Sequence, residues 1–450
     1  MKISASITVA IVGSASAWST LTMNMKAYPT AISELPSITT QSQVSIRNFK
    51  LSLNDVTVQL SSCGASITSI LLPDYSSSSP RSFDDVVLSY KSPKEQFEDN
   101  NPQFFSAIVG RVANRIKDGE FKLLQHDQSS EEVITYHLDK NDGNVNHLHG
   151  GFVGFSHKIW DAEMDENRVK FTLNSEDGDQ GYPGGIKVTA IYSLVANEDN
   201  VGAKLKLQMH ACLQDGETKA TPISLAQHCY FNLASHSSPE RILKHVLHMP
   251  HCDKFTPLDN VSCPTREVVQ TVSDKAMDFC QPKIISDALL QYGEEMVGLS
   301  PETAACNVEE VINDGNTEKI FKAPNEGDKP YGFDHNYVIC RNDDDESDLR
   351  LVAILSHPST RRSLTIHTSA PGVQLYTANY LCGTNPPAEL CKDNTKYSQW
   401  QGICLETQAF PDSIYPTPPH DNDGRGRCFI LRPGGEAYLH EVHFAFGVMQ

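Results

Sequence analysis

Alternation of hydrophobic and polar residues is the dominant pattern along this chain. Between positions 201 and 211, hydrophobic residues occupy every second position, and Lys204, Lys206, Gln208 and His210 fall between them. Successive side chains of a β-strand point to opposite faces of its sheet. The segment is therefore predicted to be a strand with one buried face and one solvated face.

Similar segments recur elsewhere in the sequence. Residues 186–192 and 349–355 have the composition of strands, and alternate positions from 440 to 446 would fall on one side of a strand. Apolar residues of both parities in the first two segments predict strands that are partly covered on both faces. Turn signals such as Asp177-Gly178 separate these segments. Together they predict an all-β protein built as an antiparallel β-sandwich.

Helical periodicity is scarce and is best developed in one segment, from Ser286 to Met296. This segment lies within a longer acidic and weakly patterned stretch, about 282–329, and a second acidic stretch covers 342–348. We interpret both stretches as solvated surface insertions. Since no shift in composition marks a boundary beyond the first 43 residues, residues 44–450 are expected to form one domain.

The N-terminal segment has the character of a targeting sequence. Lys2 precedes an uncharged run that ends in Ala15-Ser16-Ala17, which predicts a signal peptide over residues 1–17. Residues 18–43 are Ser/Thr-rich and are interpreted as a linker or a targeting extension. We therefore expect the secretory pathway and secretion. The alternatives are a plastid reached by a two-part signal, or the cytoplasm if the leader has no function.

Charge and composition exclude several classes of partner. Lys and Arg number 37 against 56 Asp and Glu, which gives a net charge of −19, so neither a nucleic acid nor an anionic membrane surface is expected to bind. No stretch approaches the ~20 apolar residues of a membrane span. The 12 cysteines include no Cys-x-x-Cys spacing. Cys252 with Cys263, and Cys382 with Cys391, are close enough in sequence for local disulfides; buried free thiols are the alternative.

Two polar segments in the first half of the chain are candidates for binding a ligand. Residues 110–116 combine arginine and asparagine, whose planar side chains offer several hydrogen-bond donors suited to vicinal hydroxyls. Residues 146–151 contain His147 and His149 followed by two glycines, which permit a close backbone approach to a ligand. The two histidines would share a strand face and could hold a metal, but no third ligand stands at a suggestive spacing.

Two later segments carry candidates for proton transfer. His228 lies among apolar and aromatic residues, where it is either a packing residue or a general acid, since the ordinary histidine pKa is near 6.5. Glu406 ends an apolar strand and precedes a turn that contains proline, where it is either an edge residue or a positioned base. Neither residue decides the chemistry alone.

Seven motifs in order resemble the aldose 1-epimerase (galactose mutarotase) family, from about residue 44 to residue 448. The motifs are GRVANRI (110–116), LHGG-x-x-GF (148–155), QGYPG (180–184), HCYFNL (228–233), GFDHNYV (332–338), PGVQLYT (371–377) and LETQ-x-FPDS (405–413). The resemblance implies a large antiparallel β-sandwich of the galactose-mutarotase type. It also implies interconversion of the α and β anomers of aldohexoses, chiefly galactose and glucose, without a metal or an organic cofactor.

The resemblance also implies a role for individual residues. Glu406 matches the general base of the family, and His228 matches its general acid. The residues that match substrate-binding positions are Asn114, Arg115, His149, Asp334 and Gln374. The implied partner is a small neutral sugar, with no nucleic acid and no membrane involved, and we expect a monomer, with a dimer as the alternative.

Some positions depart from the family pattern, and other functions compete. Cys229 stands where serine or threonine is usual, and Gln180 stands where an acidic residue commonly precedes the Gly-Tyr-Pro-Gly motif. A glycoside hydrolase or lyase would use two carboxylates, and a hexose-phosphate epimerase would need extra basic residues. The pair Arg361-Arg362 could serve the latter but is more simply a solvated turn. A non-catalytic sugar-binding protein would be expected to lack the acid–base pair.

Overall fold

The computed structural model describes residues 30–449 with eleven internal gaps. The residues outside the description between these limits are 77–81, 127–130, 199–200, 266, 272–274, 296–307, 314–315, 322–330, 341–348, 382–385 and 415–425. The predicted signal peptide, the acidic stretch 342–348 and Cys382 therefore lie outside the described residues.

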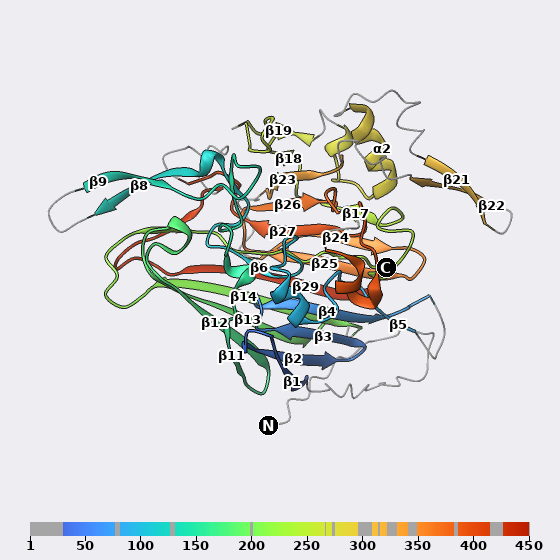
Figure 1. Cartoon of the computed structure of the whole chain (residues 1–450). Helices are drawn as coiled ribbons and strands as arrows, with labels where there is room; N and C mark the ends of the chain where they lie inside the picture. Colours follow the sequence, from blue (N-terminus) through green and yellow to red (C-terminus); the bar gives the residue numbers. More distant parts are fainter. Residues whose placement is uncertain are drawn as a thin grey trace, which may run out of the picture.

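A nine-stranded antiparallel sheet forms the largest layer of the molecule (Figure 1). Its strands, in spatial order, are β11 (Asp161–Met164), β12 (Arg168–Ser175), β13 (Ile186–Ala196), β14 (Ala203–Leu213), β29 (Tyr438–Val448), β25 (Arg362–Thr368), β24 (Arg350–His357), β17 (Val246–His248) and β20 (Lys283–Ile284). Strand β14 follows the predicted alternation: Leu205 and Leu207 are fully buried, whereas Lys204 and Lys206 are partly exposed. The segments predicted around 186–192, 349–355 and 440–446 are likewise strands, namely β13, β24 and β29.

Two five-stranded sheets pack against this layer. The N-terminal sheet contains β1 (Ala31–Thr39), β2 (Ser45–Leu53), β3 (Val56–Ser61), β4 (Ser66–Pro73) and β5 (Phe83–Asp85) in that order. The second contains β19 (Val269–Gln270), β18 (Lys254–Phe255), β23 (Asp334–Val338), β26 (Gly372–Tyr376) and β27 (Cys404–Gln408). Both run antiparallel throughout.

The buried faces of all three sheets contribute to one hydrophobic core. The rings of Phe49 on β2 and Phe171 on β12 meet edge to face at 5.8 Å, which joins the N-terminal sheet to the large sheet. Aromatic pairs in this geometry add about 0.5–1.5 kcal/mol beyond the burial of their area. The predicted fold class, an antiparallel β-sandwich, is confirmed.

Five two-stranded ladders complete the strand pairing of the described residues. These pairs are β6 (Ile108–Val109) with β16 (Ala226–Gln227), β7 (Arg115–Ile116) with β10 (His147–Leu148), β8 (Glu120–His126) with β9 (Glu131–His137), β15 (Thr221–Ile223) with β28 (Phe429–Leu431), and β21 (Val308–Asn313) with β22 (Asn316–Phe321). The β8–β9 and β21–β22 ladders are local hairpins, and the other three join segments that are farther apart in the sequence. The first two ladders join three of the motifs: β6 and β7 lie beside and within residues 110–116, β10 lies at the start of residues 148–155, and β16 lies directly before residues 228–233.

The structure differs from the sequence interpretation at two places in the backbone. Residues 31–39, placed by composition in a linker, form β1, which pairs with β2. Its side chains are exposed or only half-buried, so the strand leaves no hydrophobic signature in the sequence.

The predicted helix is present as α2 (Ile285–Glu295), but Ile285 and Leu289 are fully buried in the core, so this end of the 282–329 stretch is not a solvated insertion. A second helix, α1 (Pro93–Glu98), is capped by the side chain of Ser92.

Arg362 is the clearest departure from the expected surface chemistry. The side chain is fully buried, and its guanidinium group donates hydrogen bonds to the Pro73, Leu233 and Leu72 carbonyls and to Asp84. A solvated turn was therefore the wrong expectation for this residue, because the guanidinium satisfies carbonyl groups that would otherwise be left without donors.

The described cysteines and helices settle two further points. All ten cysteines that the structure describes are free thiols, so Cys252 and Cys263 form no local bridge and fit the free-thiol alternative. Within the described ranges, no helix combines the length and the apolar character needed to cross a bilayer.

Candidate active site

A cavity of about 430 Å³ lies where the second five-stranded sheet meets the β6–β16 and β7–β10 ladders. Six of the seven residues that the sequence singled out line this cavity. They are Asn114, Arg115, His149, His228, Asp334 and Glu406. The seventh, Gln374, lies in the strand register directly beside Glu406 and is not among the lining residues.

His228 and Glu406 face each other because the segments that carry them are aligned. Phe231 and Ile403 exchange two backbone hydrogen bonds of 2.9 Å in an antiparallel bridge. His228 precedes Phe231 by three residues, and Glu406 follows Ile403 by three, so the same register places the two side chains opposite one another. Strand β27 supplies Glu406, and His228 comes directly after β16.

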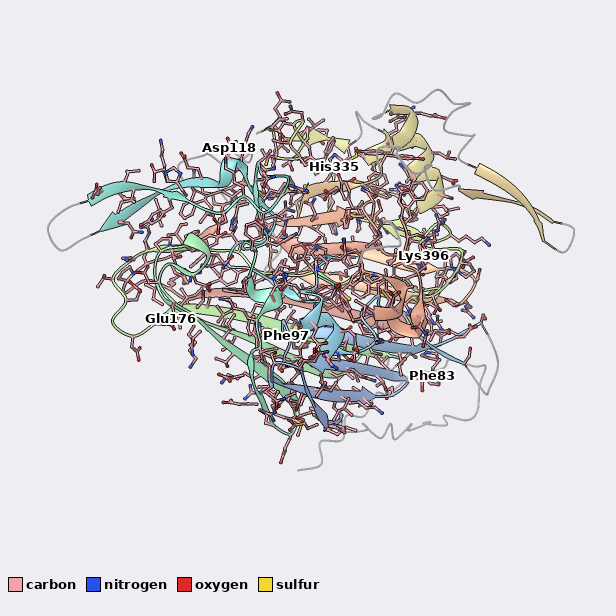
Figure 2. The ribbon with its side chains drawn as sticks, viewed as in Figure 1. Phe83, Phe97, Asp118, Glu176, His335 and Lys396 are labelled. Carbon is pink, nitrogen blue, oxygen red and sulfur yellow. The ribbon has the colours of Figure 1, made fainter. Side chains whose placement is uncertain are left out.

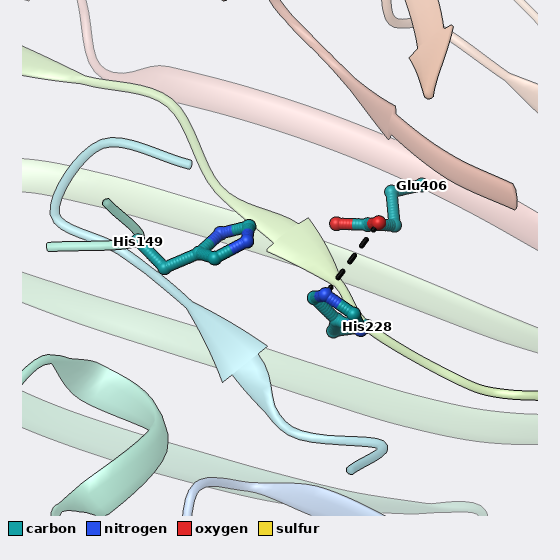
Figure 3. Close-up of side chains that lie close together, drawn as sticks. All are labelled: His149, His228 and Glu406. Atoms are coloured by element: carbon teal, nitrogen blue, oxygen red, sulfur yellow. Dashed lines mark ion pairs between the residues drawn. The ribbon is translucent and has the colours of Figure 1, made fainter. Parts of the chain in front are cut away.

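The two groups form a buried pair at the base of the cavity (Figure 3). Nε2 of His228 lies 3.6 Å from Oε1 of Glu406, and the side chains are only 5% and 2% exposed. Burial lowers the pKa of His228 to about 4, and burial together with Asp334 raises the pKa of Glu406 well above its ordinary value. Oε2 of Glu406 has no hydrogen-bond partner among the described residues. The pair thus holds a carboxyl oxygen and an imidazole nitrogen available for proton exchange with a ligand.

His149 points toward this pair from the segment that follows β10 (Figure 3). Its backbone is in the left-handed region with φ of 50°, and its Nδ1 accepts a hydrogen bond of 3.1 Å from the backbone N–H of Asn114. Burial lowers the pKa of His149 well below the ordinary value, so the ring is neutral. Because Nδ1 is an acceptor, the proton of the neutral ring sits on Nε2, which can donate to a ligand oxygen.

Arg115 and Asp334 form the polar wall on the other side of the cavity. Nη1 of Arg115 lies 3.5 Å from Oδ2 of Asp334, and its Nε donates to Asp142 at 2.8 Å. Burial opposes the charge of Arg115, but the carboxylates of Asp334 and Asp142 outweigh it and raise the pKa of the guanidinium. Nε2 of Gln374 donates to Oδ1 of Asp334 at 2.7 Å. Gln374 therefore orients Asp334, whose carboxylate faces the cavity.

Phe104 is a site residue that the sequence analysis missed. It lines the cavity, and its ring lies 4.7 Å from the ring of His149 and 5.8 Å, stacked, from that of His228. Its φ of 56° is an uncommon conformation for a bulky side chain. Asn101 braces the loop by accepting from the Phe105 N–H at 2.8 Å. Phe104 lies just before the 110–116 motif, but an aromatic residue there carries no polar signal that could have singled it out.

Gly150 and His147 do not take the roles that the sequence suggested, which were a close backbone approach to a ligand and one half of a metal-binding pair of histidines. A Cβ on Gly150, whose φ is +85°, would overlap the carbonyl group of Gly110, so this glycine allows two motifs to touch rather than a ligand to approach. His147 is turned toward the Asp139 carbonyl at 2.7 Å and is not among the cavity-lining residues. The left-handed backbone at His149 breaks the extended geometry, so the two histidines do not form the pair considered from the sequence.

A different trio has the composition of a metal site. The ligand atoms of His149, His228 and Glu406 lie within 4.8 Å of one another. A metal on Nε2 of His149 would require that nitrogen to lose its proton, which is favoured when Nδ1 donates to an acceptor. Here Nδ1 instead accepts from the Asn114 N–H. The hydrogen bonding therefore fits a donor to a ligand oxygen better than it fits a metal ligand.

Known proteins of one family are similar to this chain over most of its length. The family model of aldose 1-epimerase matches residues 47–444. Galactose mutarotase from Mus musculus is 32% identical over 419 residues, which are 93% of this chain and 98% of that protein. The Homo sapiens galactose mutarotase is 31% identical over 403 residues, 90% and 94% of the two chains. Aldose 1-epimerase from Escherichia coli (strain K12) is 29% identical over 380 residues, 84% and 89%.

Solved structures share the fold. An aldose epimerase homologue from C. elegans aligns with a TM-score of 0.63 at 21% identity, covering 94% of this chain and 100% of that chain. Galactose 1-epimerase from Lactobacillus acidophilus NCFM aligns with a TM-score of 0.63 at 23% identity, covering 94% and 99%. The sandwich is therefore of the predicted galactose-mutarotase type.

Proposed function

The chain belongs to the aldose 1-epimerase family, as its seven motifs predicted, and on this premise we propose that it interconverts the α and β anomers of aldohexoses such as galactose and glucose. It is an enzyme of that family. The observation that carries the proposal is the buried pair of His228 and Glu406, 3.6 Å apart in a cavity that Arg115 and Asp334 also line.

The pair can supply the acid and the base that ring opening needs. In the reactive form of the pair, His228 carries the proton and Glu406 is a carboxylate, a form that the positive charge of Arg115 favours at Glu406. Glu406 then takes the proton of the C1 hydroxyl, and His228 gives its proton to the ring oxygen while the bond from C1 to that oxygen breaks. The free aldehyde then rotates about the C1–C2 bond. On reclosure, His228 takes back the proton as the C5 oxygen attacks C1, and Glu406 returns its proton to the C1 oxygen. Every proton is returned, so the reaction needs no co-reactant.

The remaining residues hold the sugar while its ring is open. Arg115 and His149 offer N–H donors, and Asp334, oriented by Gln374, offers a carboxylate that accepts from hydroxyls. Asn114 lines the same wall, and its own backbone N–H fixes His149. Holding the chain in place converts reclosure into an intramolecular step and keeps the aldehyde from escaping.

Polarimetry on freshly dissolved α-galactose and α-glucose tests the proposal. Glu406→Gln and His228→Asn are each expected to reduce the rate by about 10²–10⁴-fold, because each removes one partner of proton transfer. Glu441→Gln, on the outer face of β29, is the matched control for loss of a carboxylate and should keep the wild-type rate. The proposal fails if the wild type does not accelerate mutarotation of any aldohexose, and the assigned roles fail if either site variant stays near the wild-type rate.

The leader and the oligomeric state are separate proposals. We propose that residues 1–17 are a signal peptide and that the chain works as a monomer. N-terminal sequencing of the native protein tests the first, because an intact N-terminus would contradict it. Light scattering in solution tests the second, for which a dimer would be the contrary result.

A further inference from the structure

A second cavity lies on the outer face of the N-terminal sheet. It has a volume of about 700 Å³ and shares no lining residue with the catalytic cavity. Strands β1 to β5 form one wall, and Ser235–Ser237 together with Lys392 and Asp393 form another. Phe83, labelled in Figure 2 at the edge of the blue strands, is one of its lining residues.

The floor of this cavity carries uncharged hydrogen-bonding groups. Asn48, Gln59 and Ser69 line it from β2, β3 and β4, and Gln59 lies directly across from Ser69 in the strand register. Asn48 is only 6% exposed, yet its Oδ1 has no hydrogen-bond partner among the described residues. A buried acceptor without a donor is costly, so a ligand hydroxyl that donates to this oxygen would be favoured.

An irregularity in β1 shapes the wall beside Asn48. Leu35 pairs with Asn48, but the register with β2 shifts before Ile38. Pro36, within this bulge, lines the cavity together with Leu35 and Ile38. A bulge bends its strand and interrupts the ladder, and such features are frequent beside binding sites. The bulge therefore lies next to the amide oxygen that lacks a partner.

Cations and carboxylates occur together around this cavity. Lys392 donates to Asp85 at 2.7 Å, and Asp84 binds the guanidinium group of Arg362. Burial lowers the pKa of His236, so this ring is a neutral donor to Asp393, which is 81% exposed to solvent. Lys91 lies 3.9 Å from Glu95. Since neither sign of charge dominates, the lining does not favour an ionic ligand.

An exposed aromatic ring completes the lining. Phe83 is 54% exposed, so its ring is accessible to a ligand that enters the cavity. Flat apolar rings beside a few placed polar groups are the usual composition of a small-molecule site. The C–H face of a sugar ring can lie on such a ring while its hydroxyls reach the amides and hydroxyls of the floor.

We propose that this cavity is a second, non-catalytic site that binds a neutral carbohydrate of two or more sugar units. The polar floor selects hydroxyl groups, the mixture of cations and carboxylates favours a neutral molecule over an ion, and the exposed ring of Phe83 provides a stacking surface. The size of the ligand follows from the volume, since this cavity is larger than the one assigned to a single hexose.

Saturation-transfer NMR with the full chain tests the proposal. The probes are trehalose, sucrose and methyl β-lactoside, which have no free C1 hydroxyl and so cannot be turned over. We expect saturable binding of at least one probe. Phe83→Ala and Asn48→Leu should each weaken it about fivefold, the effect of losing one contact of about 1 kcal/mol. Leu439→Ala, a residue 56% exposed on β29, is the matched control and should change nothing.

A variant of the catalytic cavity separates the two sites. Asp334→Ala should leave probe binding unchanged, whereas Phe83→Ala and Asn48→Leu should leave the mutarotation rate unchanged. The proposal is overturned if no probe binds, if Asp334→Ala abolishes binding, or if binding is insensitive to both variants of the second cavity. None of these results bears on the proposed anomerisation, which polarimetry measures independently.

Discussion

The hydroxyl group of Thr407 donates a hydrogen bond to Nε2 of His440, with 3.0 Å between the two atoms. On the other side of the ring, Nδ1 of His440 donates to the Leu225 carbonyl at 3.1 Å. Thr407 follows Glu406 directly, and Leu225 precedes His228 by three residues. Burial lowers the pKa of His440 to about 4, so this connecting ring is neutral. A single side chain on β29 therefore ties together the two segments that carry His228 and Glu406, the proposed acid–base pair.

Replacing His440 is expected to lower kcat more than it raises KM. His440→Phe removes both hydrogen bonds, and a small displacement of either partner of proton transfer can reduce the rate by about 10–100-fold. His440→Gln keeps an amide able to donate and accept, so it should restore part of the rate. Polarimetric kinetics over a range of galactose concentrations measure the effect.

His443→Gln is the control for this prediction, because His443 contacts Glu441 on the outer face of the same strand. It should behave as wild type. If His440→Phe lowers thermal stability but leaves kcat at the wild-type value, His440 supports only the fold.

The pH dependence of kcat/KM is expected to be bell-shaped. Activity requires that one of the two groups, His228 or Glu406, is protonated to act as the acid and that the other is unprotonated to act as the base. Burial lowers the pKa of His228 to about 4 and raises that of Glu406, so the pair takes up a second proton only well below pH 6.5. Activity should therefore persist as pH falls through 6.5 and be lost nearer pH 4. At high pH, the pair loses its proton and activity falls again.

Polarimetry between pH 3.5 and 10 checks this profile, and its two midpoints belong to the pair rather than to either residue. An acid limb centred at pH 6.5 or above would contradict the assigned environment of His228.

Truncating Phe104 is expected to reduce kcat/KM by about three- to tenfold. The ring packs on both His149 and His228, and such aromatic contacts are worth about 0.5–1.5 kcal/mol. Phe104→Tyr keeps these contacts and should stay near the wild-type rate. Phe152→Ala, which removes a ring that is 55% exposed, serves as the comparison. Equal rates for the wild type and Phe104→Ala would show that the ring does not position the histidines.

Arg361 and Arg362 are expected to differ sharply in their effect on stability. Arg362→Met leaves Asp84 without its buried partner and several carbonyl groups without a donor, which should cost about 3–5 kcal/mol in the free energy of unfolding. Arg361 is exposed, so Arg361→Gln should change this free energy by less than ~0.5 kcal/mol. Urea unfolding followed by fluorescence measures both, and similar values for the two variants would contradict the prediction.

The strands with one solvated face and one buried face could be predicted from the sequence. In β14 the alternation of leucine with lysine indicates which side is buried. The opposite holds for β1, whose side chains are exposed or half-buried, so that its pairing with β2 depends on backbone hydrogen bonds that no pattern of side chains reveals.

The residues of the candidate site that lie within the seven motifs could be predicted from the sequence. Asn114, Arg115, His149, His228, Asp334 and Glu406 were named from the sequence, and the fold brings them to one cavity. Phe104 and His440 were not, because their importance follows from distances to rings and strands that are remote in sequence. Gln374 was named as a binding residue, but the structure places it behind Asp334, where its amide acts on the carboxylate.

The position of β29 has a consequence for the order in which the protein can be assembled during synthesis. This strand lies between β14 and β25 in the middle of the nine-stranded sheet, yet it is made after every other strand of the described fold. Until it emerges from the ribosome, β14 and β25 each present an unpaired edge, which is a template for aggregation. His440 arrives with the same strand. The nascent chain therefore cannot complete its central sheet or brace the segments of His228 and Glu406 before this last strand is available, and chaperone binding would be most needed in that interval.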